Sequence, residues 1–417
     1  MHLTEQARAT LRLNDKGRYT LPTHGLYPYQ WNWDSAFAAW GFTTFDPDRG
    51  WTELETLLSG QWDDGMVPHI LFHRPDPGYF PGPDVWQGRG PIPSSGITQP
   101  PVAATFMAKM LAMDPAGAPR ARALWPKLHA WHRWFMTWRL DRGAVCVTHP
   151  WEAGRDNAPD WDNAMRAIDV RDVGAYTRRD TTHVDPAMRP TKYDYDRYLK
   201  LVQLGVSVNW DHGALAKINP FRVADPTMTF TLLRALRDMI TMGRRFGEDV
   251  AEIEDWIATL EAGAETLWNA DMQCYDSRDV HSGKFNDVLS NASALCWYAG
   301  LNDQRARPAI ERMLDAATYA LPSFDPAAVG FDPLRYWRGP TWPIMNYLVG
   351  SGMEEQGLSD LGRRIRDDTA QLISRHGFAE YYNPLDGTPA GGETFTWTAA
   401  VWLGWASDHR EDKRGAA

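Results

Sequence analysis

Four acidic residues lie close together in a stretch of the chain that has no helical pattern. The segment HPWEAGRDNAPDWD, residues 149–162, combines tryptophan, glycine and proline with Glu152, Asp156, Asp160 and Asp162. Glycoside hydrolysis needs two carboxyl groups, one to protonate the leaving oxygen and one to activate water or attack the sugar. An apolar aromatic environment raises the pKa of the proton donor by desolvation. The segment therefore meets what a catalytic acid requires, although a solvated acidic loop is the simpler alternative.

Three further clusters combine aromatic and polar side chains outside clear helix interiors. They are YPYQWNWDSAF at residues 27–37, YWRGPTW at residues 336–342, and GFAEYYNP at residues 377–384, which supplies Glu380. The chain holds 21 tryptophans, many of them beside glycine, proline, aspartate or asparagine. An indole ring offers a flat apolar face and one N–H donor, which suits the C–H faces of a sugar. The clusters favour a carbohydrate site, with the packing of long loops as the alternative.

The acidic residues of segment 149–162 are not equivalent. Asp160 and Asp162 stand where a helix at residues 162–168 should begin, and aspartate is a preferred helix cap. Asp156 follows Gly154 and has no capping pattern of its own. Asp156 is therefore the best candidate for chemistry, and a turn or cap residue is the competing interpretation for any single carboxylate.

Other common chemistries lack their motifs. The sequence contains no HExxH, no paired CxxC, no GxxxxGK[ST], and no GxSxG at a strand-to-helix turn. His69 and His73 are four residues apart, but without a third ligand nearby a core or loop role is favoured over zinc. We therefore expect neither a metal nor a cofactor; a structural calcium near the loop carboxylates stays an alternative that no Asp-rich motif supports.

The composition is that of an ordinary globular protein and argues against several partners. The 417-residue chain has a net charge of −10 and no basic run, which argues against nucleic acid. Cys146, Cys274 and Cys296 form neither a disulfide framework nor a metal motif, so we expect buried thiols in a reducing compartment. No apolar run is long enough to span a membrane, and the polar N-terminus predicts no signal peptide. We expect a cytoplasmic protein with a small-molecule partner, and a homo-oligomer is left open.

Helical periodicity dominates the elements that must position these residues. Apolar residues recur at steps of three and four, which is typical of amphipathic helices. The expected helices span residues 3–13, 35–44, 50–60, 98–113, 119–140, 193–204, 225–247, 249–269, 289–300, 304–316, 341–354, 359–376 and 395–407. Strand signals are weak, and neither a fixed-period repeat nor a Ser- or Gly-rich linker is present. We therefore predict one all-helical domain over residues 1–417.

Two segments interrupt the helical pattern. Residues 61–97 and 141–191 are rich in glycine, proline, tryptophan and aspartate. Long loops in compact domains are usually functional or disordered, and an aromatic composition opposes disorder. We expect these two segments to form a wall or lid over a pocket.

The four aromatic clusters, taken in order, carry a family resemblance. YPYQWNWDSAF, HPWEAGRDNAPDWD, YWRGPTW and FAEYYNP resemble the catalytic domains of glycoside hydrolase family 63, and most closely its bacterial mannosylglycerate and glucosylglycerate hydrolases. The resemblance runs from Tyr27 to Trp402 and implies an (α/α)6 toroid that hydrolyses α-glycosidic bonds with inversion. It implies Asp156 as general acid and Glu380 as general base. Because inversion leaves room for a water, we expect their carboxyl groups to lie roughly 6.5–9.5 Å apart.

The resemblance also implies a sugar pocket that draws on most of the clusters. Asp34 would bind sugar hydroxyls as a carboxylate, with a cap for a helix beginning at Ser35 as the alternative. Trp33 and Trp342 would form pocket walls, with a core position as the alternative. The implied sugar-binding residues are Tyr27, Trp33, Asp34, Gln99, Trp151, Gly154 and Trp342.

A second set of residues is implied for the aglycone. Family members that act on glycerate ethers hold its carboxylate with an arginine, a tyrosine six residues later, and a Tyr-Trp pair. Arg189 and Tyr195 have that spacing, and Tyr336-Trp337 is the pair. A carboxylate in a partly dry pocket favours a bidentate guanidinium and hydroxyl donors. An ion pair with a nearby aspartate is the alternative for Arg189.

One position departs from the family pattern. Glu393-Thr394 stands where the family often places a glutamine that helps to bind glycerate, and an acidic side chain would repel a carboxylate. A neutral aglycone such as glycerol therefore stays a candidate.

The leading hypothesis is an inverting α-glycosidase that cleaves glucosylglycerate or mannosylglycerate to sugar and glycerate. The alternatives are another exo-α-glucosidase, acting on glucosylglycerol, trehalose or a short α-glucoside, and a carbohydrate-binding protein without turnover. Gluco and manno substrates differ by one epimeric hydroxyl, which the sequence does not resolve.

Overall fold

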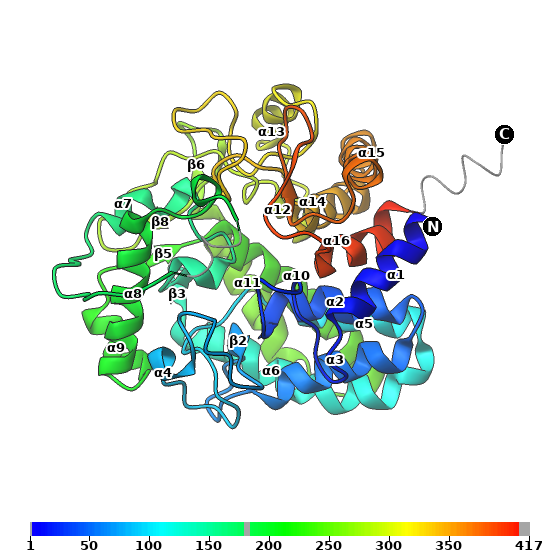
Figure 1. The fold of residues 1–417 in the computed structure, drawn as a ribbon, viewed down its shortest axis with the longest axis horizontal. Coiled ribbons are helices and arrows are strands. Elements are labelled where there is room, and N and C mark those ends of the chain that lie inside the picture. The colour runs from blue at the N-terminus through cyan, green and yellow to red at the C-terminus, as the bar shows by residue number, and fades with distance from the viewer. Residues whose placement is uncertain (1, 179–183, 408–417) are drawn as a thin grey trace.

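Six helices of the protein contact one another in a closed cycle. The computed structural model describes residues 2–178 and 184–407. The six helices are α2 (Asn32–Thr43), α5 (Ala103–Met113), α10 (Pro226–Phe246), α12 (Leu295–Tyr298), α14 (Pro343–Glu355) and α16 (Thr396–Val401). Each contacts the next in this order, and α16 returns to contact α2 (Figure 1). Apolar burial explains the cycle, because all twelve residues of α2 are buried.

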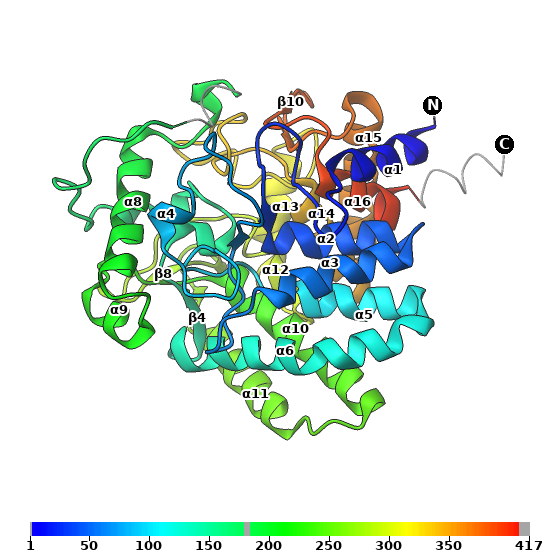
Figure 2. The ribbon, with the colours of Figure 1, turned by 60° about the horizontal axis from the view of Figure 1, so that its bottom comes forward.

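A second set of helices packs outside this cycle. These are α1 (Leu3–Asn14), α3 (Pro47–Ser59), α6 (Ala118–Trp138), α11 (Ala251–Glu265), α13 (Arg307–Asp315) and α15 (Ser359–His376). The amphipathic α15 buries only one face, which includes Ile365, Thr369 and Leu372, against α14. Figure 2 shows α3, α5 and α6 side by side, as their mutual contacts require. The structure is therefore helix-rich, as the periodicity predicted.

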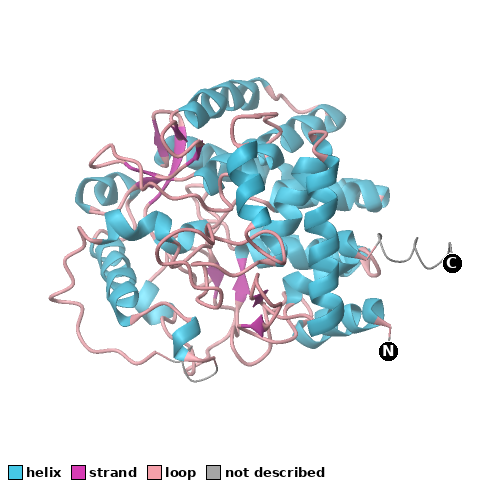
Figure 3. Ribbon diagram, turned by 90° about the horizontal axis from the view of Figure 1, so that it is seen from above, coloured by secondary structure: helices cyan, strands magenta, loops and turns pink. Residues whose placement is uncertain are grey.

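Long loops and short strands lie beside the helix cycle (Figure 3). One antiparallel sheet has the order β3 (Leu140–Asp141), β4 (Ala144–Val147), β5 (Val223–Ala224), β8 (Arg278–Asp279). The two-stranded pairs are β1 (Gln30–Trp31) with β2 (Ile70–Leu71), β6 (Trp268–Asn269) with β7 (Cys274–Tyr275), and β9 (Tyr381–Tyr382) with β10 (Pro389–Ala390). β1 leads directly into α2, β4 leads into segment 149–162, and β9 follows Glu380. The strands therefore anchor three of the four aromatic clusters.

The remaining helices are short or lie at the side of the molecule. They are α4 (Pro83–Trp86), α7 (Asp162–Met165), α8 (Lys192–Ser207) and α9 (His212–Ile218). α9 was not predicted. The helix expected at 289–300 is confined to Leu295–Tyr298, because preceding polar side chains serve other contacts: Ser293 accepts a hydrogen bond from the Tyr275 backbone, and Ser290 donates one to Asp160. The four-stranded sheet was not predicted either, because its strands are short and their sequence signals are weak.

Two capping predictions are wrong. The short helix α7 has no side-chain cap; Asp160 forms a buried ion pair with Arg155, and Asp162 pairs with Arg338. A guanidinium offers a carboxylate two charge-assisted hydrogen bonds, which a single backbone N–H cannot match. The alternative of Asp34 as a cap also fails, because α2 begins at Asn32 and places Asp34 inside its first turn.

The three cysteines are buried, as the sequence predicted. Cys146, Cys274 and Cys296 are free thiols and buried. Within residues 2–178 and 184–407, no helix is long and apolar enough to cross a membrane. The same described residues contain no group of three or more His, Cys, Asp or Glu side chains that could hold a metal.

Some contacts in the helix cycle are so close that they require glycine, and Gly352 at the contact between α14 and α12 is an example. A Cβ at Gly352 of α14 would overlap the backbone of Tyr298 in α12. We expect Gly352→Ala to lower the free energy of unfolding by about 1–3 kcal/mol through overpacking, as measured by urea denaturation. Gly213→Ala in α9 is the matched control, since its nearest neighbour would be 3.4 Å away. Equal stability of the Gly352 variant and wild type would contradict this close approach.

Candidate active site

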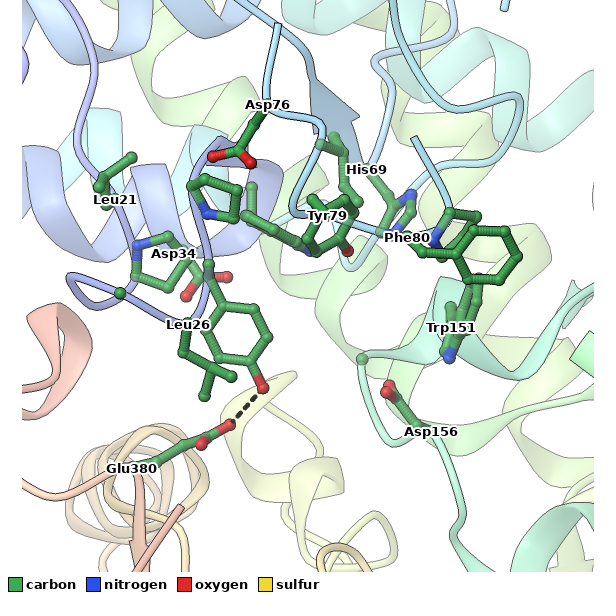
Figure 4. Close-up of a pocket in the computed structure, with 18 of the residues that line it drawn as sticks. Leu21, Leu26, Asp34, His69, Asp76, Tyr79, Phe80, Trp151, Asp156 and Glu380 are labelled. Carbon is green, nitrogen blue, oxygen red and sulfur yellow. Dashed lines mark hydrogen bonds between the residues drawn. The ribbon is translucent and has the colours of Figure 1, made fainter. Parts of the chain in front are cut away.

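One cavity of about 730 Å³ collects residues from all four aromatic clusters. Figure 4 shows Asp156 and Glu380 reaching into this pocket from opposite sides, with Asp34 of α2 on a third side. The predicted site residues that line the cavity are Tyr27, Trp33, Asp34, Gln99, Trp151, Gly154, Asp156, Arg189, Tyr195, Tyr336 and Glu380. Segments far apart in the sequence therefore meet at one site.

Two predicted substrate contacts lie behind the cavity lining. Trp337 and Trp342 are buried and stack with ring centroids 3.9 Å apart and planes at 5°. Trp342 also stacks on Tyr381, and its indole N–H donates to the backbone oxygen of Tyr336 at 3.2 Å. Neither tryptophan is among the residues that border the cavity. In this structure they support Tyr336 instead of forming a pocket wall.

Glu380 is a buried carboxylate held on both of its oxygens. Its Oε2 accepts a hydrogen bond from the Gly392 backbone at 2.8 Å. Its Oε1 accepts longer bonds from the Tyr27 hydroxyl at 3.2 Å and the Tyr336 hydroxyl at 3.4 Å. Gly391 has φ +75°, and a Cβ there would overlap this carboxylate, so the close approach of the β9–β10 turn requires glycine.

The environment of Glu380 sets its proton affinity. Burial raises the pKa of Glu380, while the positive charge of Arg189 and the hydrogen bonds from Gly392, Tyr27 and Tyr336 oppose that rise. Burial likewise raises the pKa of Tyr27 well above its ordinary value, so its hydroxyl remains a donor at neutral pH. Such opposing effects on one buried carboxyl group are typical of functional sites.

Asp156 is half-buried in the turn that follows a 3-10 helix at Pro150–Ala153. Its backbone oxygen accepts a hydrogen bond from the Tyr198 hydroxyl at 2.7 Å. Gly154 has φ +68°, and a Cβ there would stand 2.6 Å from the Trp33 ring. The turn is therefore pressed against the cavity wall. The carboxyl separation of 6.5–9.5 Å from Glu380 stays a prediction.

The other acids of segment 149–162 serve as anchors for this turn. Glu152 pairs with Arg139 at 3.0 Å and accepts a hydrogen bond from the Thr148 backbone at 2.6 Å. Asp160 pairs with Arg155, whose guanidinium is buried and also contacts Asp225 at 3.0 Å. Of the four carboxylates, Asp156 is the one that borders the cavity.

Asp34 presents an unsatisfied oxygen at the site. Its side chain is buried, and Oδ1 has no hydrogen-bond partner within the described residues. Burial, followed by the charge of Glu380, raises the pKa of Asp34 well above its ordinary value. Gln99 lies close by and accepts a hydrogen bond from the Trp33 backbone at 3.2 Å. A buried oxygen without a protein partner is free to accept a hydrogen bond from a ligand hydroxyl.

Arg189 places a buried positive charge beside the Glu380 carboxylate. It donates a hydrogen bond to the Tyr27 hydroxyl at 3.0 Å, and its guanidinium lies 4.3 Å from the centre of the Tyr336 ring. Tyr195 borders the same cavity, with the guanidinium of Arg178 4.1 Å from its ring centre. The arginine and tyrosine expected to hold the aglycone therefore line one cavity together.

Glu393 does not bring a negative charge into the cavity. Its side chain is exposed, and its backbone oxygen accepts a hydrogen bond from Thr23. Neither Glu393 nor Thr394 borders the cavity. The departure from the family pattern therefore carries no repulsion toward an anionic aglycone in this structure.

Several lining residues were not identified from sequence. His69 borders the cavity, hydrogen-bonds with Ser95 at 2.7 Å, and stacks on Trp151. Tyr79 and Phe80 enter from segment 61–97, whose aromatic content was the available signal. Other missed lining residues include Lys16, Arg74, Trp86, Arg178, Phe395 and Trp397. Isolated charged and aromatic residues belong to no sequence motif, so only the folded structure identifies them as lining residues.

Comparisons with known proteins agree with this geometry. The model of the mannosylglycerate hydrolase MGH1-like glycoside hydrolase domain matches residues 27–398. Mannosylglycerate hydrolase MGH2 of Selaginella moellendorffii is 43% identical over 96% of this chain and 85% of its own. Glucosylglycerate hydrolase of Mycolicibacterium hassiacum is 32% identical over 97% of each chain.

A solved structure is similar over nearly the whole chain. The crystal structure of the family 63 mannosylglycerate hydrolase from Thermus thermophilus, in complex with Tris and D-glycerate, superposes with a TM-score of 0.94. It is 44% identical and covers 97% of this chain and 99% of its own. The chain belongs to the mannosylglycerate hydrolase MGH1-like glycoside hydrolases of family 63.

Proposed function

We propose that this chain hydrolyses glucosylglycerate or mannosylglycerate to the sugar and D-glycerate, with inversion. The observation that carries the proposal is the joint presence in one cavity of Asp156, Glu380 and the buried Arg189. Two carboxyl groups suit glycoside hydrolysis, and a guanidinium with tyrosine hydroxyls suits the carboxylate of glycerate. Relatives that carry these two substrate names, at 43% and 32% identity, support the substrate class.

The two carboxyl groups take different roles. Asp156 protonates the glycosidic oxygen as the sugar–aglycone bond breaks. Glu380 removes a proton from the water that attacks the anomeric carbon from the other side. Its Oε2 is held by the Gly392 backbone, whereas its Oε1 makes only long bonds to Tyr27 and Tyr336. An entering water can therefore replace a weak contact at Oε1 while the carboxylate stays oriented.

The sugar and aglycone subsites follow from the lining. Asp34, with its unpartnered Oδ1, accepts sugar hydroxyls, and Trp33 and Trp151 supply apolar faces. Gly154 lets the acid turn approach Trp33 closely. Arg189 and Tyr195, with Tyr336, take the glycerate carboxylate. Trp337 and Trp342 act through Tyr336, against which Trp342 packs.

We further propose that the helices form an (α/α)6 toroid within one domain over residues 1–417. The closed cycle from α2 to α16, with an outer helix beside most of its members, supports this arrangement. Segments 61–97 and 141–191 both contribute lining residues, which supports their role as a lid. A cytoplasmic location and a homo-oligomer stay predictions.

A hydrolysis screen tests the proposed activity. Glucosylglycerate, mannosylglycerate, glucosylglycerol and trehalose are incubated with wild type and with Asp156→Ala, and sugar release is measured. We expect the glycerate glycosides to be preferred, and the variant to lose about 10²–10⁴-fold in kcat because it lacks the proton donor. Faster turnover of trehalose or glucosylglycerol would overturn the substrate, and full activity of Asp156→Ala would overturn the mechanism. No turnover by wild type would favour a binding protein.

The pH dependence of kcat/KM tests Glu380 as the base. The base must be ionised, so activity falls as the pH drops through its pKa, which burial raises above the ordinary glutamate value. Tyr27 donates a hydrogen bond that favours the ionised form, so Tyr27→Phe raises the pKa further. We expect the acid limb of the profile to move to higher pH in Tyr27→Phe. A limb that stays in place, or moves to lower pH, would contradict this assignment.

Substitution of Arg189 tests the aglycone subsite. Arg189→Lys keeps the charge but loses the planar two-donor geometry, so we expect KM for a glycerate glycoside to rise about tenfold. Arg189→Gln also removes the charge, and a rise of about 100-fold follows from a lost charge-assisted hydrogen bond. The inhibition constant of uncharged D-glucose is the control and stays near wild type. Equal weakening of D-glucose would place Arg189 in the sugar subsite instead.

A further inference from the structure

Two cations that line the cavity, and a third on the same turn as one of them, have no assigned role. Lys16 and Arg74 both line the cavity but come from different parts of the chain, and Arg18 lies on the same turn as Lys16. Arg18 and Arg74 are exposed and Lys16 is half-buried. None of the three side chains forms an ion pair with any residue in 2–178 or 184–407.

Ring stacking joins the two segments that carry these cations. Tyr19 stacks on His73 with ring centroids 4.3 Å apart, which places the turn at residues 15–20 beside Arg74. The turn is closed by a hydrogen bond from the Lys16 backbone N–H to the Tyr19 oxygen at 2.9 Å. His73 itself hydrogen-bonds with Gln30 at 2.7 Å, next to the strand that leads into α2. The cations therefore stand on a supported edge of the cavity.

Nearby carboxylates leave a positive balance at this edge. Asp15 is already paired with Arg49 at 2.8 Å. Asp76 lines the cavity and accepts a hydrogen bond from the Gly78 backbone at 2.8 Å. Among the residues that line the cavity at this edge, Lys16 and Arg74 therefore outnumber the single carboxylate of Asp76. Burial, reinforced by the charge of Arg18, lowers the pKa of His73 to about 4, so this histidine is neutral at pH 7 and adds no charge.

The positive edge contrasts with the whole molecule. The chain carries a net charge of −10, and farther into the cavity the carboxyl groups of Asp34, Asp156 and Glu380 stand against the cations Arg178 and Arg189. Such a protein repels an anion at long range, whereas charges within about 8 Å dominate at physiological ionic strength. An anionic substrate therefore needs local cations on its route into the cavity, while a neutral glycoside does not.

We propose that Lys16, Arg18 and Arg74 form a cationic entrance that selects anionic glycosides before they reach Arg189. The inference rests on the proposed function and deepens it, because it assigns the preference for a charged aglycone to residues outside the bond-breaking centre. The entrance lowers KM for a substrate that bears a carboxylate and leaves the chemical step unchanged.

Charge reversal of the two lining cations provides the test. Lys16→Glu with Arg74→Glu is compared with Arg245→Glu with Lys284→Glu, which changes net charge equally at exposed positions that do not border the cavity. At about 20 mM NaCl we expect KM for the preferred glycerate glycoside to rise about threefold to tenfold in the first variant, with kcat unchanged. At about 300 mM NaCl the difference shrinks because salt screens the charges. The control variant stays at wild-type KM.

Two further measurements make the result specific. The inhibition constant of D-glucose, which is uncharged, stays at the wild-type value in both variants. Lys16→Gln with Arg74→Gln gives a smaller rise in KM than the double glutamate variant. An unchanged KM at low salt, an equal loss of D-glucose affinity, or the same effect in the control variant would overturn the entrance.

Binding of D-glycerate separates this inference from the proposed function. If wild type hydrolyses neither glycerate glycoside, the proposed function fails. Calorimetry at low salt still compares D-glycerate affinity between wild type and the two charge-reversal variants. Weaker binding only in Lys16→Glu with Arg74→Glu supports the entrance, and equal binding in all three overturns it.

Discussion

The site depends on one buried carboxylate that is stabilised without being neutralised by a direct ion pair. Glu380 receives a short hydrogen bond from a backbone N–H and two long ones from tyrosine hydroxyls. Arg189 contacts Tyr27 and so acts on Glu380 through a hydroxyl. A direct guanidinium contact would lock the carboxylate as an anion and occupy the space that the proposed attacking water needs. The intervening tyrosine keeps the charge near and the position open.

This requirement explains much of the surrounding structure. Tyr336 must hold its hydroxyl against Glu380, and it packs edge-on against Trp342, which in turn stacks on Trp337 and Tyr381. Trp337 donates its backbone N–H to Asn157, the residue after Asp156, at 2.9 Å. The aromatic stack therefore links the turn of the proposed acid to the proposed base. Close aromatic packing holds the segments that carry Asp156 and Glu380 in fixed positions relative to each other, which loops alone would not do.

The acidic residues of segment 149–162 differ in their partners. Arg139 and Arg155 neutralise Glu152 and Asp160 inside the protein, so their burial is compensated. Asp156 is left at the cavity surface. Asp156, which the sequence singled out because it lacks a capping pattern, is the one of the four acids that borders the cavity. The sequence predicted the wrong roles for Asp160 and Asp162, because only the folded chain shows that they pair with Arg155 and Arg338 instead of capping a helix.

The amino-acid sequence by itself determined the helical character, the aromatic loops, the acidic segment 149–162 and the family. These features are local: helical period, composition and motif order are readable within a short window. Tertiary structure alone decided that Trp337 and Trp342 support the lining from behind, that Glu393 points away, and that Lys16 and Arg74 share the cavity mouth. The reason is physical. Burial and electrostatic partners are properties of side chains brought together from distant segments, and residue types and spacing do not encode which face of a loop meets the cavity.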